Sequence, residues 1–319
     1  MAYLLTLGGF VLLFLGGESL VRGAVSLARR LGVSTIFIGA VVVGFGTSAP
    51  EFLVSLQAAL SGHDDVTIGN IVGSNIANVM LILGTAAMIQ PVRNRPATLR
   101  RDGSAMLLSS ALLVGLAYVG GVDRLTGLAM LAALAGFLVY SIRCERNGQA
   151  EAVYEQEIAD LGAAPSHLWM ALLAAALGIA ALVAGANMLI EGATTIARQA
   201  GIPDAVIGVT LVALGTSLPE LATVLVAALR KHADVALGSV LGSNVFNVLG
   251  MLGLTAAIEP LVIAPAFLDL DLWVMLGVSG LLVVFLATGQ QVSRRESALF
   301  LAGYVAYMAY LLSGASAVV

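Results

Sequence analysis

Runs of apolar residues long enough to cross a membrane follow one another along almost the whole chain. A helix needs about 20 apolar residues to span the hydrocarbon core of a bilayer, and ten such runs lie between short polar or glycine-rich breaks. Their approximate ranges are 3–28, 33–61, 66–89, 99–119, 125–142, 168–197, 203–229, 235–258, 269–288 and 297–313. Only 11% of the residues are charged, against about 25% in soluble domains. We therefore predict an all-α integral membrane protein with ten transmembrane helices. The composition argues against a soluble enzyme, a disordered chain, a nucleic-acid-binding protein and a disulfide-stabilised scaffold.

The one sustained polar stretch divides these runs into two sets of five. It covers residues 144–166 and contains five acidic residues, and we interpret it as a polar cytoplasmic linker. The first five-helix half would then be residues 1–143, and the second would be residues 167–319. The single cysteine, Cys144, has no partner for an intramolecular disulfide.

The positions of the basic residues predict how the chain is oriented, because Lys and Arg favour cytoplasmic loops. If the N-terminus is outside, the cytoplasmic loops hold twelve basic residues: Arg29, Arg30, Arg93, Arg95, Arg100, Arg101, Arg143, Arg146, Arg230, Lys231, Arg294 and Arg295. The opposite loops then hold only Arg124 and Arg198. We therefore expect both termini to lie outside the cytoplasm.

The two halves carry the same sequence pattern. A shift of 169 residues aligns residues 38–91 with residues 207–260 without a gap, and 26 of the 54 aligned positions are identical. Because each half has an odd number of spans, the second copy would enter the membrane in the opposite direction. Inverted repeats of this kind are typical of secondary transporters, whose substrates bind near the membrane midplane where the repeats meet. Residues 169 positions apart are called repeat mates below.

Four carboxylates lie well inside the predicted spans, and each requires an explanation because an ionised carboxylate in a bilayer is costly unless it is paired. Glu51 and Glu220 are repeat mates, so symmetric halves would bring them to the same depth, facing each other. We expect Glu18 to pair with Arg22, four residues later on the same helix and near its cytoplasmic end. We expect Glu191 to lie near the outer rim.

The segments around Glu51 and Glu220 favour a bound cation. Each contains Gly-Thr-Ser-x-Pro-Glu, in which glycine and proline make a regular helix costly. Backbone freed in this way is tolerated at membrane depth only where it lines a cavity or binds something. A cage of hard oxygens would result. Its members would be the backbone carbonyls near Thr47 and Thr216, the hydroxyls of Ser48 and Ser217, and the carboxylates of Glu51 and Glu220. Such ligands suit Ca²⁺ or Na⁺ better than zinc or copper, and two glutamates neutralise one Ca²⁺.

The next span of each half adds polar side chains on one helix face. Both copies contain Gly-Ser-Asn-x-x-Asn, in which Ser74 and Asn78 share a face, as do Ser243 and Asn247. These residues could alternatively serve helix packing and interhelical hydrogen bonds. Their duplication beside the glutamates favours ion binding.

The paired Gly-Thr-Ser-x-Pro-Glu and Gly-Ser-Asn-x-x-Asn motifs resemble the two alpha-repeats of the sodium/calcium exchangers in the cation/calcium antiporter superfamily, of the bacterial or archaeal type. The alpha-1 motif would be residues 38–91 and the alpha-2 motif residues 207–260. The resemblance implies that the second, third, seventh and eighth helices form a core over which the long first and sixth helices slide. It implies a central Ca²⁺ site with four ligands, namely Glu51, Glu220 and the carbonyls of Thr47 and Thr216. It also implies Na⁺ sites formed by Ser48, Ser74, Asn78, Ser217, Ser243 and Asn247, with the carbonyls of Gly44 and Ala213.

One position bears on the coupling ion. Potassium-dependent members of this superfamily carry an aspartate where this chain has Asn247, so the asparagine favours potassium independence. The proton-coupled branch usually has other residues in place of Gly-Thr-Ser, which makes proton coupling the weaker reading.

We therefore expect an antiporter, not an enzyme, that exchanges Ca²⁺ for Na⁺ by alternating access. A Ca²⁺/H⁺ antiporter and a potassium-dependent exchanger are the alternatives. A channel fits less well with duplicated halves around one charged pocket, and a metalloenzyme would need a His ligand or a nucleophile–base pair within the spans. We expect Ca²⁺ and Na⁺ as transported ions, no cofactor, no nucleic-acid partner, function as a monomer, and a multi-pass location in the cell (inner) membrane.

Overall fold

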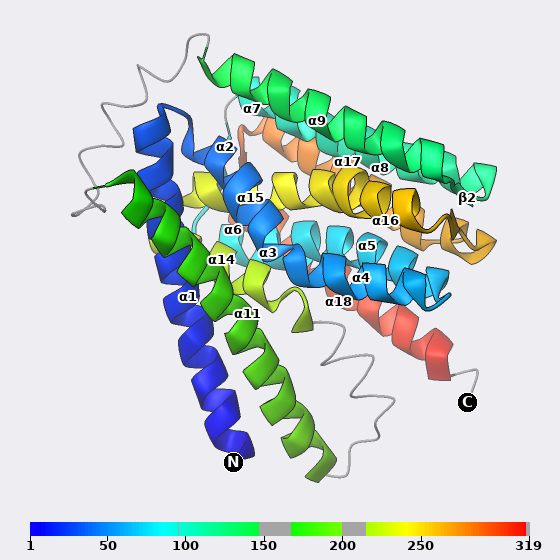
Figure 1. The fold of residues 1–319 in the computed structure, drawn as a ribbon, viewed down its shortest axis with the longest axis horizontal. Coiled ribbons are helices and arrows are strands. Elements are labelled where there is room, and N and C mark those ends of the chain that lie inside the picture. The colour runs from blue at the N-terminus through cyan, green and yellow to red at the C-terminus, as the bar shows by residue number, and fades with distance from the viewer. Residues whose placement is uncertain (95, 147–166, 200–214, 317–319) are drawn as a thin grey trace.

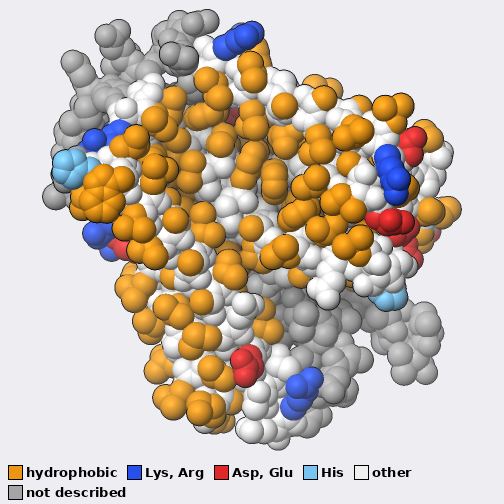
Figure 2. Space-filling view, viewed as in Figure 1, with side chains coloured by type: hydrophobic (Ala, Val, Ile, Leu, Met, Phe, Trp, Pro, Cys, Tyr) orange, Lys and Arg blue, Asp and Glu red, His pale blue; other side chains and the backbone are white. Residues whose placement is uncertain are grey.

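The chain folds as a helical, multi-pass membrane protein (Figure 1). The structure is a computed structural model that describes residues 1–94, 96–146, 167–199 and 215–316. Seven of the described helices are long and apolar enough to cross a membrane, and a pair bent by 45°, Thr35–Thr47 and Ala49–Leu60, makes an eighth. Figure 2 shows hydrophobic side chains over the middle of one face, with charged side chains around its edge. A lipid-facing surface has this distribution.

The first half begins with one long helix and continues through helices that contain π-helical segments, labelled η1, η2 and η3. Its elements are α1 (Ala2–Leu31), α2 (Thr35–Ile38), η1 (Gly39–Gly44), α3 (Phe45–Thr47), α4 (Ala49–Leu60), α5 (Asp64–Ala77), η2 (Asn78–Leu83), α6 (Gly84–Ile89), β1 (Val92–Arg93), α7 (Pro96–Thr98), η3 (Leu99–Gly103), α8 (Ser104–Val119), β2 (Gly121–Val122) and α9 (Arg124–Arg146).

The second half follows the same order where it is described. Its elements are α11 (Leu168–Gln199), α14 (Leu218–Leu229), α15 (Ala233–Val245), the π-helix η5 (Phe246–Leu252), α16 (Gly253–Ile258), β3 (Leu261–Val262), the 3-10 helix η6 (Pro265–Leu268), α17 (Asp271–Thr288), β4 (Gln291–Val292) and α18 (Arg294–Ser316). Helices overlap all ten predicted apolar runs. Only the α14 part of the run predicted at 203–229 is described, and most of the predicted linker, residues 147–166, lies outside the described residues.

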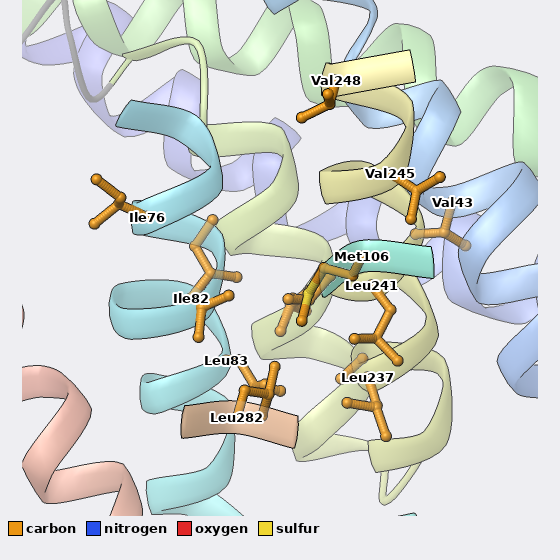
Figure 3. Close-up of a cluster of buried hydrophobic side chains, with 14 of the residues drawn as sticks. Val43, Ile76, Ile82, Leu83, Met106, Leu237, Leu241, Val245, Val248 and Leu282 are labelled. Carbon is orange, nitrogen blue, oxygen red and sulfur yellow. The ribbon is translucent and has the colours of Figure 1, made fainter. Parts of the chain in front are cut away.

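Two spans, one formed by α5, η2 and α6 and the other by α15, η5 and α16, form the centre of the molecule. Within the most apolar 18-residue stretch of each span, 78% of the residues are buried in Asp64–Ile89 and 94% in Ala233–Ile258. The corresponding fractions are 33% in α1 and 28% in α11. Figure 3 shows buried hydrophobic side chains from five different parts of the chain meeting here, among them Val43, Ile76, Ile82, Leu83, Met106, Leu237, Leu241, Val245, Val248 and Leu282. The long helices α1 and α11 therefore lie at the periphery, beside this centre.

Helices α1 and α11 lie side by side along most of their length (Figure 1). Glycines allow this close approach. A Cβ atom added at Gly16 would lie 2.8 Å from the backbone nitrogen of Leu182, and one added at Gly178 would lie 2.6 Å from that of Leu20. Small residues that let backbones touch are the usual basis of helix association in membranes, so these two helices form one closely packed pair.

Several contacts join the two halves in a reciprocal pattern. The hydroxyl oxygens of the repeat mates Ser110 and Ser279 lie 3.3 Å apart, between α8 and α17. Strand β1 pairs with β4, and β2 pairs with β3. Helix α9 packs on α16, and α18 packs on α6, so the last helix of each half covers the third span of the other half. The strands were not predicted, because two residues are too few to produce a sequence pattern.

Candidate cation site

The helix carrying each repeated glutamate begins at a break in the chain. Ser48 (φ −80°, ψ 4°) precedes α4, and its repeat mate Ser217 (φ −86°, ψ 3°) precedes α14. A proline follows near the start of each helix, where its missing N–H is not needed by the helix. These breaks place Glu51 and Glu220 in the first turn of α4 and α14, where the helix dipole favours a negative charge.

Glu51 and Glu220 are buried side chains, 1% and 3% exposed. Each has one carboxylate oxygen, Oε2, without a hydrogen-bond partner, and the two groups are close enough to interact electrostatically. Among the ion pairs of the described residues, none involves either glutamate. Two buried carboxylates without a basic partner need a cation or protons to offset the cost of desolvation.

The serines at the breaks reach across to the opposite half. The Ser48 hydroxyl donates to Glu220 Oε1 at 2.9 Å and lies 3.2 Å from the hydroxyl oxygen of Ser243. In the reciprocal arrangement, Ser217 lies close enough to Glu51 to interact with its carboxylate. Five of the predicted ion ligands are therefore in one contiguous polar cluster.

The carbonyl oxygen of Gly44, a predicted ion ligand, already accepts hydrogen bonds in this conformation. The Gly44 carbonyl accepts hydrogen bonds from the hydroxyls of Thr47 (3.3 Å) and Ser243 (3.1 Å). It also accepts from the backbone N–H of Ser48 at 3.2 Å. The predicted role of this carbonyl as a sodium ligand would therefore require at least one of these donors to move away.

The remaining predicted ligands are placed less completely. Thr47 is fully buried at the end of α3, and Thr216 is half-buried in the turn before Ser217. Ser74 is buried on α5, one helical turn before Asn78. Ala213 lies outside the described residues.

Two asparagine side chains complete the cluster and follow the same reciprocal pattern. Asn78 Nδ2 donates to Asn244 Oδ1, and Asn247 Nδ2 donates to Asn75 Oδ1, both at 3.0 Å. The Oδ1 atoms of Asn78 and Asn247 are buried and have no partner. The unpartnered oxygens of this cluster thus form two pairs of repeat mates, one of glutamate Oε2 atoms and one of asparagine Oδ1 atoms. The prediction missed Asn75 and Asn244, although both belong to the duplicated Gly-Ser-Asn-x-x-Asn motif.

Irregular helix surrounds these residues. Asn78 begins the π-helix η2 and Asn247 lies in the π-helix η5, and these two segments occupy matching positions in the two halves. π-Helical turns are rare and are often found at functional sites. No group of three or more His, Cys, Asp or Glu residues in the described part of the chain could hold a metal. An ion here would therefore depend on hydroxyl, amide and backbone oxygens besides the two carboxylates.

Comparison with known proteins identifies the family. A protein-family model described as sodium/calcium exchanger protein matches residues 1–143 and 170–313. The chain belongs to this family. This match confirms the resemblance seen in the duplicated motifs. The family consists of transporters rather than enzymes.

Relatives of this family member match it over nearly its full length. It is 34% identical over 347 residues to the sodium/calcium exchanger MaX1 of Methanosarcina acetivorans, covering 97% of this chain and 98% of the relative. It is 33% identical over 321 residues to the inner membrane protein YrbG of Escherichia coli, covering 98% and 97%. Its fold matches a structure of the sodium-calcium exchanger NCX_Mj soaked with zero Na⁺ and Ca²⁺, with a TM-score of 0.84, 30% identity and coverage of 97% of this chain and 98% of that chain.

The other two intramembrane glutamates of this family member lie apart from the cluster. Glu18 Oε1 pairs with Arg22 Nε at 2.6 Å, which confirms the predicted pair. Glu18 Oε2 also pairs with Arg230 Nε at 2.6 Å, a contact between α1 and the end of α14 that sequence spacing could not predict. Glu191 is exposed on α11.

Proposed function

We propose that this family member is an antiporter that exchanges Ca²⁺ for Na⁺ by alternating access, with the ions bound between Glu51 and Glu220. The observation that carries the proposal is the pair of buried carboxylates, each with an unpartnered oxygen and neither paired with a described basic residue. One Ca²⁺, or at least two Na⁺, would neutralise these charges. The empty site would leave both charges stranded in a medium of low dielectric constant, so the empty protein resists closing around it. Access then changes only when ions are bound, which produces exchange rather than leak.

The ligands proposed for each ion are those that the resemblance to the sodium/calcium exchangers implies. Ca²⁺ takes six to eight oxygen ligands, and we assign to it Glu51, Glu220 and the carbonyls of Thr47 and Thr216. Na⁺ would use the neutral oxygens around this centre, those of Ser48, Ser74, Asn78, Ser217, Ser243 and Asn247 and the carbonyls of Gly44 and Ala213. Competition of the two ions for this one pocket would couple their transport.

For the architecture, we propose ten transmembrane helices in two inverted repeats, residues 1–143 and 167–319, joined by a cytoplasmic linker at 144–166. The reciprocal contacts between repeat mates support this arrangement, in particular the Ser110–Ser279 contact. Both termini would lie outside the cytoplasm, and the closely packed α1–α11 pair would slide over the central helices. We propose the cell (inner) membrane as the location, with support from the name of the Escherichia coli relative, and a functional monomer.

The test is ⁴⁵Ca²⁺ uptake into proteoliposomes that contain the purified full-length protein. A Na⁺ gradient directed outward should drive uptake, and potassium or proton gradients imposed separately should not. Glu51→Gln and Glu220→Gln should each abolish uptake, because each removes a charge that the ion neutralises.

Glu191→Gln is the matched control, since it makes the same change at an exposed intramembrane glutamate. This variant should transport like the wild type. Uptake that survives Glu51→Gln or Glu220→Gln would refute the site. Uptake driven by a proton gradient in the absence of Na⁺ would refute sodium as the coupling ion.

A further inference from the structure

Four asparagines form a hydrogen-bonded group that adjoins the serine–glutamate cluster, because Asn244 directly follows Ser243 on α15. We call Asn75, Asn78, Asn244 and Asn247 the asparagine quartet. All four are buried: Asn78 is 2% exposed, and each of the other three is 1% exposed. The bonds from Asn78 to Asn244 and from Asn247 to Asn75 connect opposite halves of the chain.

Each of these bonds determines which way a side-chain amide points. A carboxamide has an NH₂ donor on one side and an oxygen acceptor on the other. Because Asn247 gives its NH₂ group to Asn75 Oδ1, its own oxygen must face the opposite way, where it has no partner. The same reasoning applies to Asn78, whose NH₂ group goes to Asn244 Oδ1.

Asn75 and Asn244 are oriented in turn by methionines. Asn75 Nδ2 donates to the sulfur of Met275, and Asn244 Nδ2 donates to the sulfur of Met106, both at 3.7 Å. A thioether accepts hydrogen bonds but cannot donate them, so it selects the NH₂ side of each amide. Both methionines are fully buried, and they are repeat mates. Asn244 Nδ2 also lies 3.2 Å from the carbonyl oxygen of Asn75.

The contacts therefore form two relays of repeat mates, which differ in that Asn244 Nδ2 also donates to the Asn75 carbonyl. One runs from Met275 on α17 through Asn75 on α5 to Asn247 on η5. The other connects their repeat mates on α8, α15 and η2. Each relay starts at a buried sulfur and ends at an unpartnered amide oxygen in the candidate site.

We propose that Asn75 and Asn244 are positioning residues that set the sodium affinity of the site. Each holds the ligand amide of the opposite half with its oxygen toward the ion, and neither touches the ion. The inference rests on the proposed function, in which Asn78 and Asn247 serve Na⁺ while the glutamates hold Ca²⁺. Losing the orientation should therefore weaken Na⁺ more than Ca²⁺.

The test measures ⁴⁵Ca²⁺ binding to the full-length protein in detergent, together with its displacement by Na⁺. Loss of a group that orients a metal ligand lowers metal affinity by roughly 10–100-fold. Asn75→Leu should therefore require at least about tenfold more Na⁺ for half-displacement, while the Kd for Ca²⁺ stays close to that of the wild type. Met275→Leu keeps the packing but removes the sulfur acceptor, and it should produce a smaller shift in the same direction.

Double variants separate a positioning role from a general loss of stability. If Asn75 acts through Asn247, then adding Asn75→Leu to Asn247→Ala should cause no further loss of Na⁺ affinity. Added to Asn78→Ala, which lies in the other relay, it should multiply the loss. A general packing defect would give the same added loss in both backgrounds, and that result would overturn the proposal, as would wild-type displacement by Na⁺ in both Asn75→Leu and Met275→Leu.

Glu51→Gln shows which assumption has failed. Loss of Ca²⁺ binding in this variant together with the wrong coupling pattern would overturn the positioning role alone. Retained Ca²⁺ binding would overturn the proposed site, and the positioning role with it.

Discussion

The packing of α1 against α11 predicts that a single methyl group at Gly16 destabilises the protein. A Cβ atom there would lie 2.8 Å from the backbone nitrogen of Leu182 and 2.9 Å from the carbonyl oxygen of Gly178, whereas ordinary contacts begin at 3.4 Å. Backbone atoms of a helix cannot turn aside, so the two helices would have to separate along the contact. Overpacking of this kind costs about 1–3 kcal/mol. Alanine in place of glycine inside a helix recovers about 1 kcal/mol, so the net loss for Gly16→Ala should be up to about 2 kcal/mol.

Gly115 is the matched control for this substitution. It lies inside α8, and a Cβ atom added there would meet nothing within 4 Å. Gly115→Ala should therefore show only the helix-propensity gain, and the difference between the two variants should equal the overpacking cost of about 1–3 kcal/mol. Thermal unfolding in one detergent measures it, and we expect Gly16→Ala to unfold several degrees below Gly115→Ala. Equal unfolding temperatures, or a higher one for Gly16→Ala, would refute the close packing of α1 on α11.

Three further predictions concern the ends of helices. Arg230→Gln should lower the unfolding temperature more than Arg22→Gln, because only the first removes an ion pair between different helices; the effect should be at most about 1 kcal/mol and should shrink in high salt. Hydrogen bonds from the side chain and backbone of Thr126 lower the pKa of Asp123 at the start of α9. The carboxylate therefore stabilises the fold above its ordinary pKa and loses this effect as the pH falls through the lowered value, so Asp123→Ala should reduce the unfolding temperature at neutral pH but not in strong acid. A constant difference across that range would contradict the assignment. Lys231 has a φ of 62°, which favours glycine, so Lys231→Gly should leave the unfolding temperature unchanged or raise it, and a clear decrease would show that the lysine side chain makes a stabilising contact.

The positions of the helices could be predicted from the sequence because they follow from local properties. Within the described residues, each long apolar run overlaps a helix, since a backbone in lipid must satisfy its own hydrogen bonds. The breaks before α4 and α14 were also predictable, because glycine and proline act on the segment that contains them. The pair of Glu18 with Arg22 is local in the same sense, since four residues make one helical turn.

Contacts between distant segments could not be predicted in this way. Spacing shows that Ser74 and Asn78 share a helix face, but it does not show which atoms lie opposite that face. The second partner of Glu18, the occupied carbonyl of Gly44 and the orienting role of Asn75 all depend on residues many positions away. Duplication of the Asn75 motif was a usable signal, yet it marked the residue without indicating its partner.

The sequence by itself determined that the chain enters the membrane as apolar helices, that its two halves are copies, and that two of its few intramembrane carboxylates are related by the duplication. Only the tertiary structure decided that the serine and asparagine of one half contact the glutamate and asparagine of the other, and that four buried oxygens of the candidate site remain unpartnered. The physical reason is one of range. Transfer of apolar residues into lipid and the restrictions of glycine and proline act within a segment, whereas a buried polar atom is satisfied or left free according to what the packing of remote segments places beside it.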